Sequence, residues 1–185
     1  MHEKRFHGQA DRLRSPERVA RLEVERAVQL SLDGLPAVES ILDVGTASGL
    51  FAEAFVAQAS KVVGLDVNEE MLALARSLVP GADFRQGTQE AMPSPDDSFD
   101  LVFFGLVLHE TDDLALALSE AQRCARLRAA VLEWPYLEEV MGPPLAHRLS
   151  PQRVQEAAEE AGFAQVTVLP MTYMVLYLFS QPTST

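Results

Sequence analysis

The chain of 185 residues is 48% hydrophobic and 23% charged, which is typical of one globular domain with a substantial core. Its formal net charge of −12 disfavours nucleic acid as a substrate, because an acidic surface repels phosphate backbones. No apolar stretch reaches about 18 uncharged residues, so we expect no membrane span.

The start of the chain and its cysteine content favour a cytoplasmic protein. Residues 1–7 lack the apolar core of a secretory signal peptide. The single cysteine, Cys124, rules out an internal disulfide and fits a reducing compartment. Cys124 also lies on the apolar side of a helical pattern, which predicts a buried and inert thiol. The sequence leaves a monomer and a homodimer open.

Residues 1–36 are expected to form a tail and one helix ahead of the main domain, which spans residues 37–185. Ser15 is placed to cap this helix, Pro16 follows at its first position, and the turn residues 33–36 end it. Because the helix precedes the first strand, it is a candidate lid over a ligand pocket.

Phe6 and His7 would belong to such a lid, and the alternative is a frayed tail. Basic residues also gather in this part of the chain, where we expect a solvated helix face rather than a binding patch. They are Lys4, Arg5, Arg12, Arg14, Arg18 and Arg21.

Short apolar runs alternate with helical patterns along the rest of the chain, which predicts a parallel sheet with helices on both faces. We expect strands at residues 40–44, 61–66, 82–85, 99–105 and 128–133. Thr111 is expected to cap the helix before the last of these strands. Two final runs, 164–169 and 172–180, indicate a β-hairpin that completes the sheet. The expected fold is therefore α/β, doubly wound and mostly parallel, with a C-terminal antiparallel hairpin.

The most informative stretch is residues 41–51, in which an apolar run ends in an acid and is followed by small residues and then an apolar helical pattern. A strand, a tight turn and a helix in this order expose helix N–H groups at the carboxyl end of a strand, where open α/β sheets bind nucleotide-like ligands. Gly45 and Gly49 permit backbone angles and close approaches that a Cβ would forbid.

The glycine spacing distinguishes between ligands. The three glycine positions of a dinucleotide fingerprint hold Gly45, Ala47 and Leu50, so the second and third glycines are missing. Asp43, two residues before the first glycine, suits a positively charged ligand better than a pyrophosphate. The stretch resembles the first motif of the class I S-adenosylmethionine-dependent methyltransferases, acid-x-Gly-x-Gly-x-Gly, with Ala47 at the middle glycine.

Two later segments carry the same resemblance. Asp66 closes the second expected strand, where an acid can accept hydrogen bonds from both ribose hydroxyls; its alternative role is to cap the next helix. Residues 86–93 resemble the family segment Gly-Asp-Ala-Glu-x-Leu-Pro, with Thr88 at the aspartate that accepts a hydrogen bond from the adenine amino group. A hydroxyl accepts this bond more weakly than a carboxylate does.

The resemblance covers residues 37–180 and implies a Rossmann-like, seven-stranded domain that transfers a methyl group from S-adenosylmethionine to a small-molecule acceptor by in-line displacement. In the family, the first acid holds the cofactor's ammonium group, and N–H groups of the glycine loop approach its carboxylate. The implied cofactor-binding residues are Asp43, Gly45, Thr46, Ala47, Ser48, Gly49, Asp66, Val67, Met71, Thr88, Gln89, Glu90 and Gly105.

On the acceptor side, His109 follows the fourth expected strand, beside which the family places the acceptor. Its ordinary pKa suits a general base for a hydroxyl or amine, and its alternative role is a hydrogen bond at the start of the next helix. Residues 133–136 and the pair His147 and Arg148 are further candidates to line the pocket. No cluster has metal-ligand spacing, and no nucleophile elbow is present, so we expect neither a metal site nor acyl-enzyme chemistry.

Two other functions remain as alternatives. One is a non-catalytic protein of the same fold that binds or scaffolds a partner, an alternative left open by Thr88 and Ala47. The other is a nicotinamide-dependent oxidoreductase, which the glycine spacing disfavours.

Overall fold

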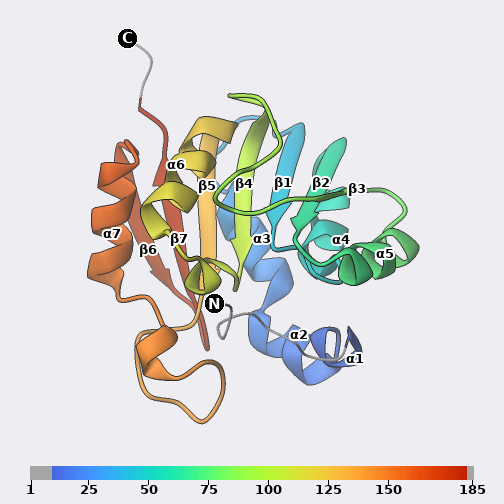
Figure 1. Ribbon diagram of the computed structural model, residues 1–185, viewed down its shortest axis with the longest axis horizontal. Helices are drawn as coiled ribbons and strands as arrows, with labels where there is room; N and C mark the ends of the chain where they lie inside the picture. Colours follow the sequence, from blue (N-terminus) through green and yellow to red (C-terminus); the bar gives the residue numbers. More distant parts are fainter. Residues whose placement is uncertain (1–9, 183–185) are drawn as a thin grey trace.

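The computed structural model describes residues 10–182, so Phe6 and His7 lie outside the described residues (Figure 1). A seven-stranded sheet with the order β3-β2-β1-β4-β5-β7-β6 forms its centre. The strands are β1 (Ser40–Val44), β2 (Lys61–Asp66), β3 (Asp83–Gln86), β4 (Phe99–Gly105), β5 (Ala125–Glu133), β6 (Gln165–Pro170) and β7 (Val175–Ser180). Strands β1 to β5 pair in parallel, and β7 is antiparallel to both β5 and β6. The expected fold class is confirmed.

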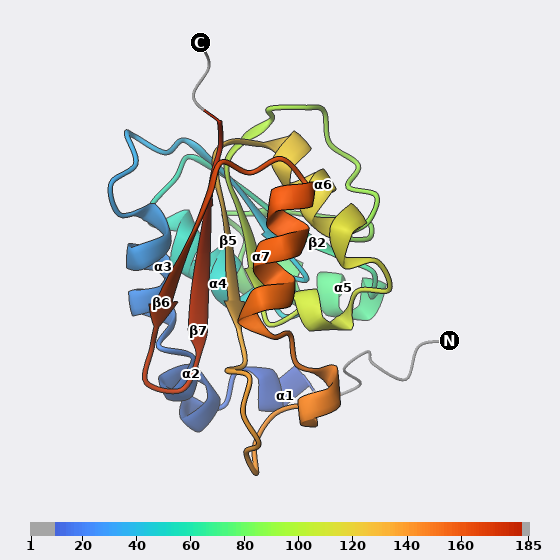
Figure 2. The same cartoon turned by 90° about the vertical axis from the view of Figure 1, so that its left-hand side faces the viewer.

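Helices cover both faces of the sheet (Figure 2). They are α1 (Ala10–Leu13), α2 (Pro16–Leu22), α3 (Val24–Leu32), α4 (Leu50–Val56), α5 (Glu69–Leu78), α6 (Leu114–Cys124) and α7 (Pro151–Glu160). Alternate residues of β1 point to opposite faces, so Leu42 belongs to the apolar cluster under α6 and α7, and Ile41 to the cluster under α3, α4 and α5. Such two-sided burial explains the continuous apolar runs of the parallel strands.

The expected single N-terminal helix is wrong in one respect, because it is broken at Glu23 into α2 and α3. Glu23 has a left-handed backbone with φ 46°. Its carboxylate accepts hydrogen bonds from the backbone N–H of Thr172 at 2.8 Å and from the Thr172 hydroxyl at 3.1 Å. This contact with the β6–β7 turn holds the corner between the two helices. The Ser15 cap is confirmed, since its hydroxyl accepts from the N–H of Arg18.

The helix after β4 begins later than expected. Asp113, not Thr111, caps α6 by accepting a hydrogen bond from the N–H of Leu116 at 3.0 Å. The Thr111 hydroxyl instead donates to the carboxylate of Glu90 at 2.5 Å. Helix α6 then runs directly into β5, which is why that strand starts before residue 128. Cys124 at this junction is buried, and burial raises the pKa of its thiol to about 11, as expected of an inert thiol.

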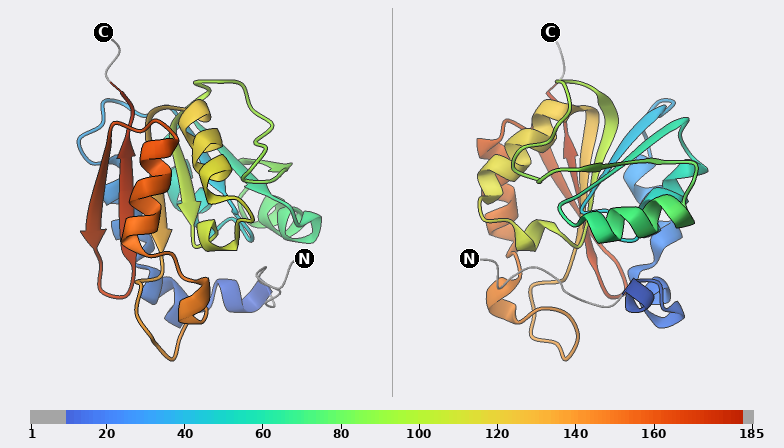
Figure 3. Two further views of the ribbon diagram at one scale, coloured as in Figure 1. Left: turned by 60° about the vertical axis from the view of Figure 1, so that its left-hand side comes forward. Right: turned by 45° about the vertical axis from the view of Figure 1, so that its right-hand side comes forward.

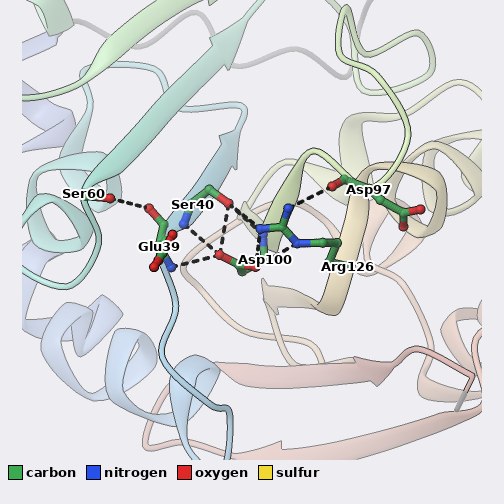
Figure 4. Close-up of polar contacts among 6 residues, drawn as sticks. All are labelled: Glu39, Ser40, Ser60, Asp97, Asp100 and Arg126. Atoms are coloured by element: carbon green, nitrogen blue, oxygen red, sulfur yellow. Dashed lines mark hydrogen bonds and ion pairs between the residues drawn. The ribbon is translucent and has the colours of Figure 1, made fainter. Parts of the chain in front are cut away.

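A polar cluster ties the amino ends of β1 and β4 together (Figure 4). One carboxylate oxygen of Asp100 accepts from the N–H groups of Glu39 and Ser40, each at 2.9 Å, and from the Ser40 hydroxyl at 3.0 Å. Its other oxygen pairs with the guanidinium of Arg126. These bonds satisfy a buried carboxylate and fix one end of the sheet. No helix within residues 10–182 is long and apolar enough to span a membrane.

Candidate functional site

The carboxyl ends of the parallel strands bring four segments together. Val44 of β1 pairs with Leu65 of β2 and with Phe104 of β4, so the glycine loop, Asp66 and Gly105 follow neighbouring strands at one edge of the sheet. Glu133 ends β5 at the same edge. Figure 3 shows α1, α2 and the segment between β5 and α7 at this end of the molecule. The sequence places the glycine loop, Asp66 and His109 at the ends of expected strands, and in a parallel sheet such ends meet at one edge.

The glycine loop has three residues with left-handed backbone angles: Gly45 (φ 68°), Ala47 (φ 45°) and Gly49 (φ 76°). A Cβ on Gly45 would lie 2.5 Å from the side chain of Val107, so the segment after β4 packs directly on the loop. Ala47 stands where the family motif has glycine, and it adopts an angle that favours glycine. Ala47 therefore takes a left-handed backbone angle that glycine adopts more readily.

Asp43 lies under the loop and connects it to α4. Its Oδ2 atom accepts from the Thr46 hydroxyl at 2.6 Å and from the N–H of Ala52 at 3.0 Å, and the side chain is buried. Burial raises the pKa of Asp43 to about 7, against the effect of these two hydrogen bonds, and the charge of Asp66 adds to the rise. A buried carboxylate beside a second acid favours a positively charged ligand.

Asp66 lies against the loop from the neighbouring strand. One carboxylate oxygen accepts from the N–H of Ala47 at 2.8 Å, and the other from the N–H of Asn68 at 2.9 Å. Asn68, not Asp66, caps α5 through its side chain. The next residue, Val67, is 37% exposed and offers an apolar surface for a planar ring. Met71 lies in the first turn of α5, where its N–H donates to the Asn68 side chain.

The segment after β3 carries three of the implied cofactor-binding residues, Thr88, Gln89 and Glu90. The Nε2 atom of Gln89 donates to the backbone carbonyl of Val107 at 3.4 Å, and its Oε1 atom is buried without a partner within residues 10–182. Thr88 makes a short antiparallel bridge with Ala91. The carboxylate of Glu90 accepts from Thr111 and holds this segment to the start of α6. The adenine role of Thr88 and Gln89 stays a prediction.

His109 and Glu133 form a buried pair between the ends of β4 and β5. The Nδ1 atom of His109 lies 2.9 Å from each carboxylate oxygen of Glu133, and its backbone N–H donates to one of them at 3.0 Å. Burial by itself lowers the pKa of His109, but the charge and hydrogen bonding of Glu133 outweigh it and raise the pKa above its ordinary value. The chain reaches this position by a sharp turn at Leu106, a non-glycine residue with φ 60°. Such strain concentrates at functional sites.

Arg148 shapes the segment between β5 and α7. Its guanidinium donates to the backbone carbonyls of Pro143 at 3.0 Å, Pro135 at 2.9 Å and Met141 at 2.6 Å. It also pairs with Glu139 at 3.3 Å, and only 4% of the residue is exposed. Arg148 therefore holds the segment in its folded path by binding the segment's main-chain carbonyls. From the sequence, Arg148 was only a candidate to line the pocket, and its hold on this segment was not predicted.

The N-terminal basic residues are not all solvated, which corrects the expectation for that part of the chain. The guanidinium of Arg14 donates to the carbonyl of Ser48 in the glycine loop at 2.9 and 3.3 Å and pairs with Glu53 of α4 at 2.6 Å. Arg21 lies over the ring of Tyr173 in the β6–β7 turn, 4.9 Å from its centre. No sequence pattern indicates these contacts. Across the described part of the chain, no group of three or more His, Cys, Asp or Glu residues is arranged to hold a metal ion.

Comparison with known proteins agrees with this geometry. Residues 42–131 match the family model of a methyltransferase domain. The chain is 28% identical over 154 residues to the uncharacterized methyltransferase YcgJ of Bacillus subtilis. This alignment covers 77% of this chain and 60% of that protein. It is 40% identical over 84 residues to a demethylmenaquinone methyltransferase of Chlorobaculum parvum. That alignment covers 45% of this chain and 35% of the relative.

The chain thus spans less than two thirds of the length of these curated relatives. Among solved structures, it superposes on an S-adenosylmethionine-dependent methyltransferase from Aquifex aeolicus with a TM-score of 0.80 and 24% identity, over 92% of this chain and 95% of that one. At this identity, the likeness shows a shared fold.

The chain has the Rossmann-like fold of the S-adenosylmethionine-dependent methyltransferase on which it superposes, as the first-motif resemblance predicts. Residues 42–131 match a methyltransferase domain, for which S-adenosylmethionine is the expected cofactor.

Proposed function

We propose that this protein transfers a methyl group from S-adenosylmethionine to a hydroxyl or amine of a small-molecule acceptor, with His109 as the general base. The observation that supports the proposal most is the buried pair of His109 and Glu133 at the carboxyl edge of the sheet, next to the glycine loop. A raised-pKa histidine in such a place is a candidate for proton transfer.

The residues around the glycine loop fit the cofactor. Asp66 offers carboxylate oxygens for ribose hydroxyls, Val67 an exposed apolar surface for the adenine, and Asp43 a buried carboxylate for a cationic group. The unpartnered Oε1 atom of Gln89 supports the same conclusion, because a buried acceptor without a donor is costly unless a ligand supplies one. The bound cofactor supplies an electrophilic methyl group on a sulfonium.

Glu133 determines which nitrogen of His109 acts. Because both Glu133 oxygens face Nδ1, that atom carries the proton, and Nε2 is left as the proton acceptor. The proton of the acceptor's O–H or N–H would pass to Nε2 while the lone pair of the acceptor atom bonds to the methyl group, and the methyl–sulfur bond would break with S-adenosylhomocysteine as the leaving group. The small-molecule character of the acceptor is supported by the net charge of −12, which disfavours nucleic acid.

We also propose that residues 10–32 form a roof over the site, as expected for a lid. This segment contacts the glycine loop through Arg14 and Ser48, and the β6–β7 turn through Glu23 and Thr172. It thereby connects the proposed cofactor side of the site with the acceptor side.

Calorimetric titration with S-adenosylmethionine, S-adenosylhomocysteine and NADH tests the proposal, with Asp66→Ala as the variant. We expect micromolar binding of both sulfur ligands, lost in the variant, and no binding of NADH. Binding of NADH alone would indicate the oxidoreductase alternative, and binding of none would favour the scaffold alternative.

A further inference from the structure

An apolar groove of about 330 Å³ lies between the segment after β5, the β6–β7 turn and the start of α7. Its walls are aromatic and aliphatic side chains, including Tyr136, Leu137, Tyr173 and Tyr177. Three of these are unusually exposed for their type: Tyr136 by 47%, Leu137 by 53% and Tyr173 by 46%. Large apolar side chains left open around a hollow indicate a binding surface.

The groove lies beside the strand that carries Glu133 of the proposed catalytic pair. Val175, which lines it, is the register partner of Glu133, and Tyr177 is the partner of Val131. The charge of Glu133 also adds to the effect of burial in raising the pKa of Tyr177 to about 12. A ligand in the groove would therefore lie against β7, next to the end of β5 where Glu133 is.

The charges of the groove disfavour an anionic ligand. Glu139 is the only charged residue among the described residues that line it, and its carboxylate is paired with Arg148 at 3.3 Å. No lysine, arginine or histidine of residues 10–182 lines the groove. Two arginines contact its wall residues, Arg148 through Glu139 and Arg21 over the ring of Tyr173, but neither lines the groove. A carboxylate or phosphate placed there would lose its hydration without a cation inside the groove, which is unfavourable.

We propose that this groove binds the body of the methyl acceptor, and that the acceptor is an uncharged, ring-bearing apolar molecule whose hydroxyl or amine reaches Nε2 of His109. The inference rests on the proposed function and adds the substrate class to it. The tyrosine rings of the groove favour a ligand that carries a ring, because paired aromatic rings gain more binding energy than the apolar area they bury provides.

The test compares two probes of similar shape, 2-naphthol and 2-naphthoate, titrated calorimetrically into the protein saturated with S-adenosylhomocysteine. We expect 2-naphthol to bind at least about tenfold more tightly, because the anion lacks a partner in the groove. Leu137→Asp should weaken 2-naphthol binding about tenfold or more by placing a charge in the groove. The affinity for S-adenosylhomocysteine should be unchanged.

Val140→Asp is the matched control, because Val140 is in the same segment, is fully exposed and does not line the groove. It should leave both affinities unchanged. Equal binding of the two probes, or equal effects of the two variants, would overturn the inference. These results are distinct from failure of the proposed function, which would appear as absent binding of S-adenosylhomocysteine before any probe is added.

Discussion

The imidazole of His109 faces the carboxylate of Glu133 with Nδ1 at 2.9 Å from both oxygens, and neither residue is more than 9% exposed. Glu133 is also held in place, since one of its oxygens accepts from the N–H of Trp134 at 3.1 Å. The pair is thus oriented by the backbone N–H groups of His109 and Trp134, which leaves little freedom for the imidazole to rotate.

Glu133→Gln removes the negative charge of this pair and keeps the size and shape of the side chain. Loss of the charge should lower the pKa of His109, so the rise of methyl transfer with pH shifts to lower pH. The plateau rate should fall by about 10–100-fold, because the imidazole loses its fixed tautomer. Glu110→Gln is the comparison, since that carboxylate lies 4.0 Å from Nε2 and raises the pKa of His109 less than Glu133 does, so its shift should be smaller. An unmoved pH profile in Glu133→Gln would contradict the positioning role.

The charge on Asp43 should stabilise a bound ligand at the expense of the fold. Its pKa of about 7 lies above the ordinary 3.8, so its contribution to stability is complete below about pH 4 and is lost as the pH rises through 7. Asp43→Asn should therefore raise the free energy of unfolding at pH 8 by roughly 1–3 kcal/mol, since one pKa unit corresponds to about 1.4 kcal/mol. It should also weaken S-adenosylmethionine binding.

Urea denaturation at pH 5 and pH 8 checks this prediction, with calorimetry for the affinity. The gain in stability should be smaller at pH 5, where the wild-type carboxyl is largely protonated. A variant that is destabilised by the same amount at both pH values would show that the hydrogen bonds to Thr46 and Ala52 matter more than the charge.

Two glycines distinguish backbone strain from a steric clash. Gly45 and Gly34 have similar angles, φ 68° and 72°, but a Cβ on Gly34 meets no atom within 4 Å. Gly34→Ala should cost about 1–2 kcal/mol from the left-handed backbone alone. Gly45→Ala should cost about 1–3 kcal/mol more because the Cβ overlaps Val107. Thermal unfolding measures both, and Val107→Ala should recover part of the excess only in the Gly45 variant.

Asp100 should matter for stability and not for the ligand, because it lies at the amino ends of the strands (Figure 4). Burial alone raises its pKa, but hydrogen bonds from Arg126, Glu39 and Ser40 lower it below its ordinary value. Its contribution is therefore present above about pH 4 and is lost as the pH falls through the lowered pKa. Asp100→Asn should cost about 1–3 kcal/mol in denaturant unfolding, with cofactor affinity unchanged. Asp96→Asn, in an exposed ion pair, should cost much less.

Arg14 tests the roof over the glycine loop. Arg14→Ala removes two hydrogen bonds to the Ser48 carbonyl, and S-adenosylhomocysteine should bind about 3–10-fold more weakly. The measurement is calorimetric, with Arg26→Ala as the control, because Arg26 contacts only Glu23 at the surface among the ion pairs of residues 10–182. Equal affinities in both variants would mean that the roof does not act on the loop.

The sequence was sufficient for the sheet because its strands are continuous apolar runs bounded by turns, and the bounds of β1, β2 and β4 are those expected. It did not predict the break at Glu23, because the partner that holds it, Thr172, is 149 residues away. The contact of Arg14 with Ser48 was missed for a related reason: a backbone carbonyl leaves no trace in a residue pattern.

The site was predicted in part. The glycine loop, Asp66 and His109 were recognised from local motifs and strand-end positions, and the structure brings them to one edge. Glu133 was identified only as a lining residue, because its partnership with His109 depends on the register of β5 against β4. Contacts between strands are not encoded in local spacing, whereas loop chemistry is.

The segment between β5 and α7 is held chiefly by main-chain carbonyls that accept from Arg148, and every amino acid has such a carbonyl. Substitutions at residues 136–141 therefore change the side chains presented at the proposed acceptor groove while the path of the chain persists. One buried arginine thus separates the shape of the loop from the identity of its exposed side chains, so the proposed acceptor specificity can change while the loop keeps its conformation.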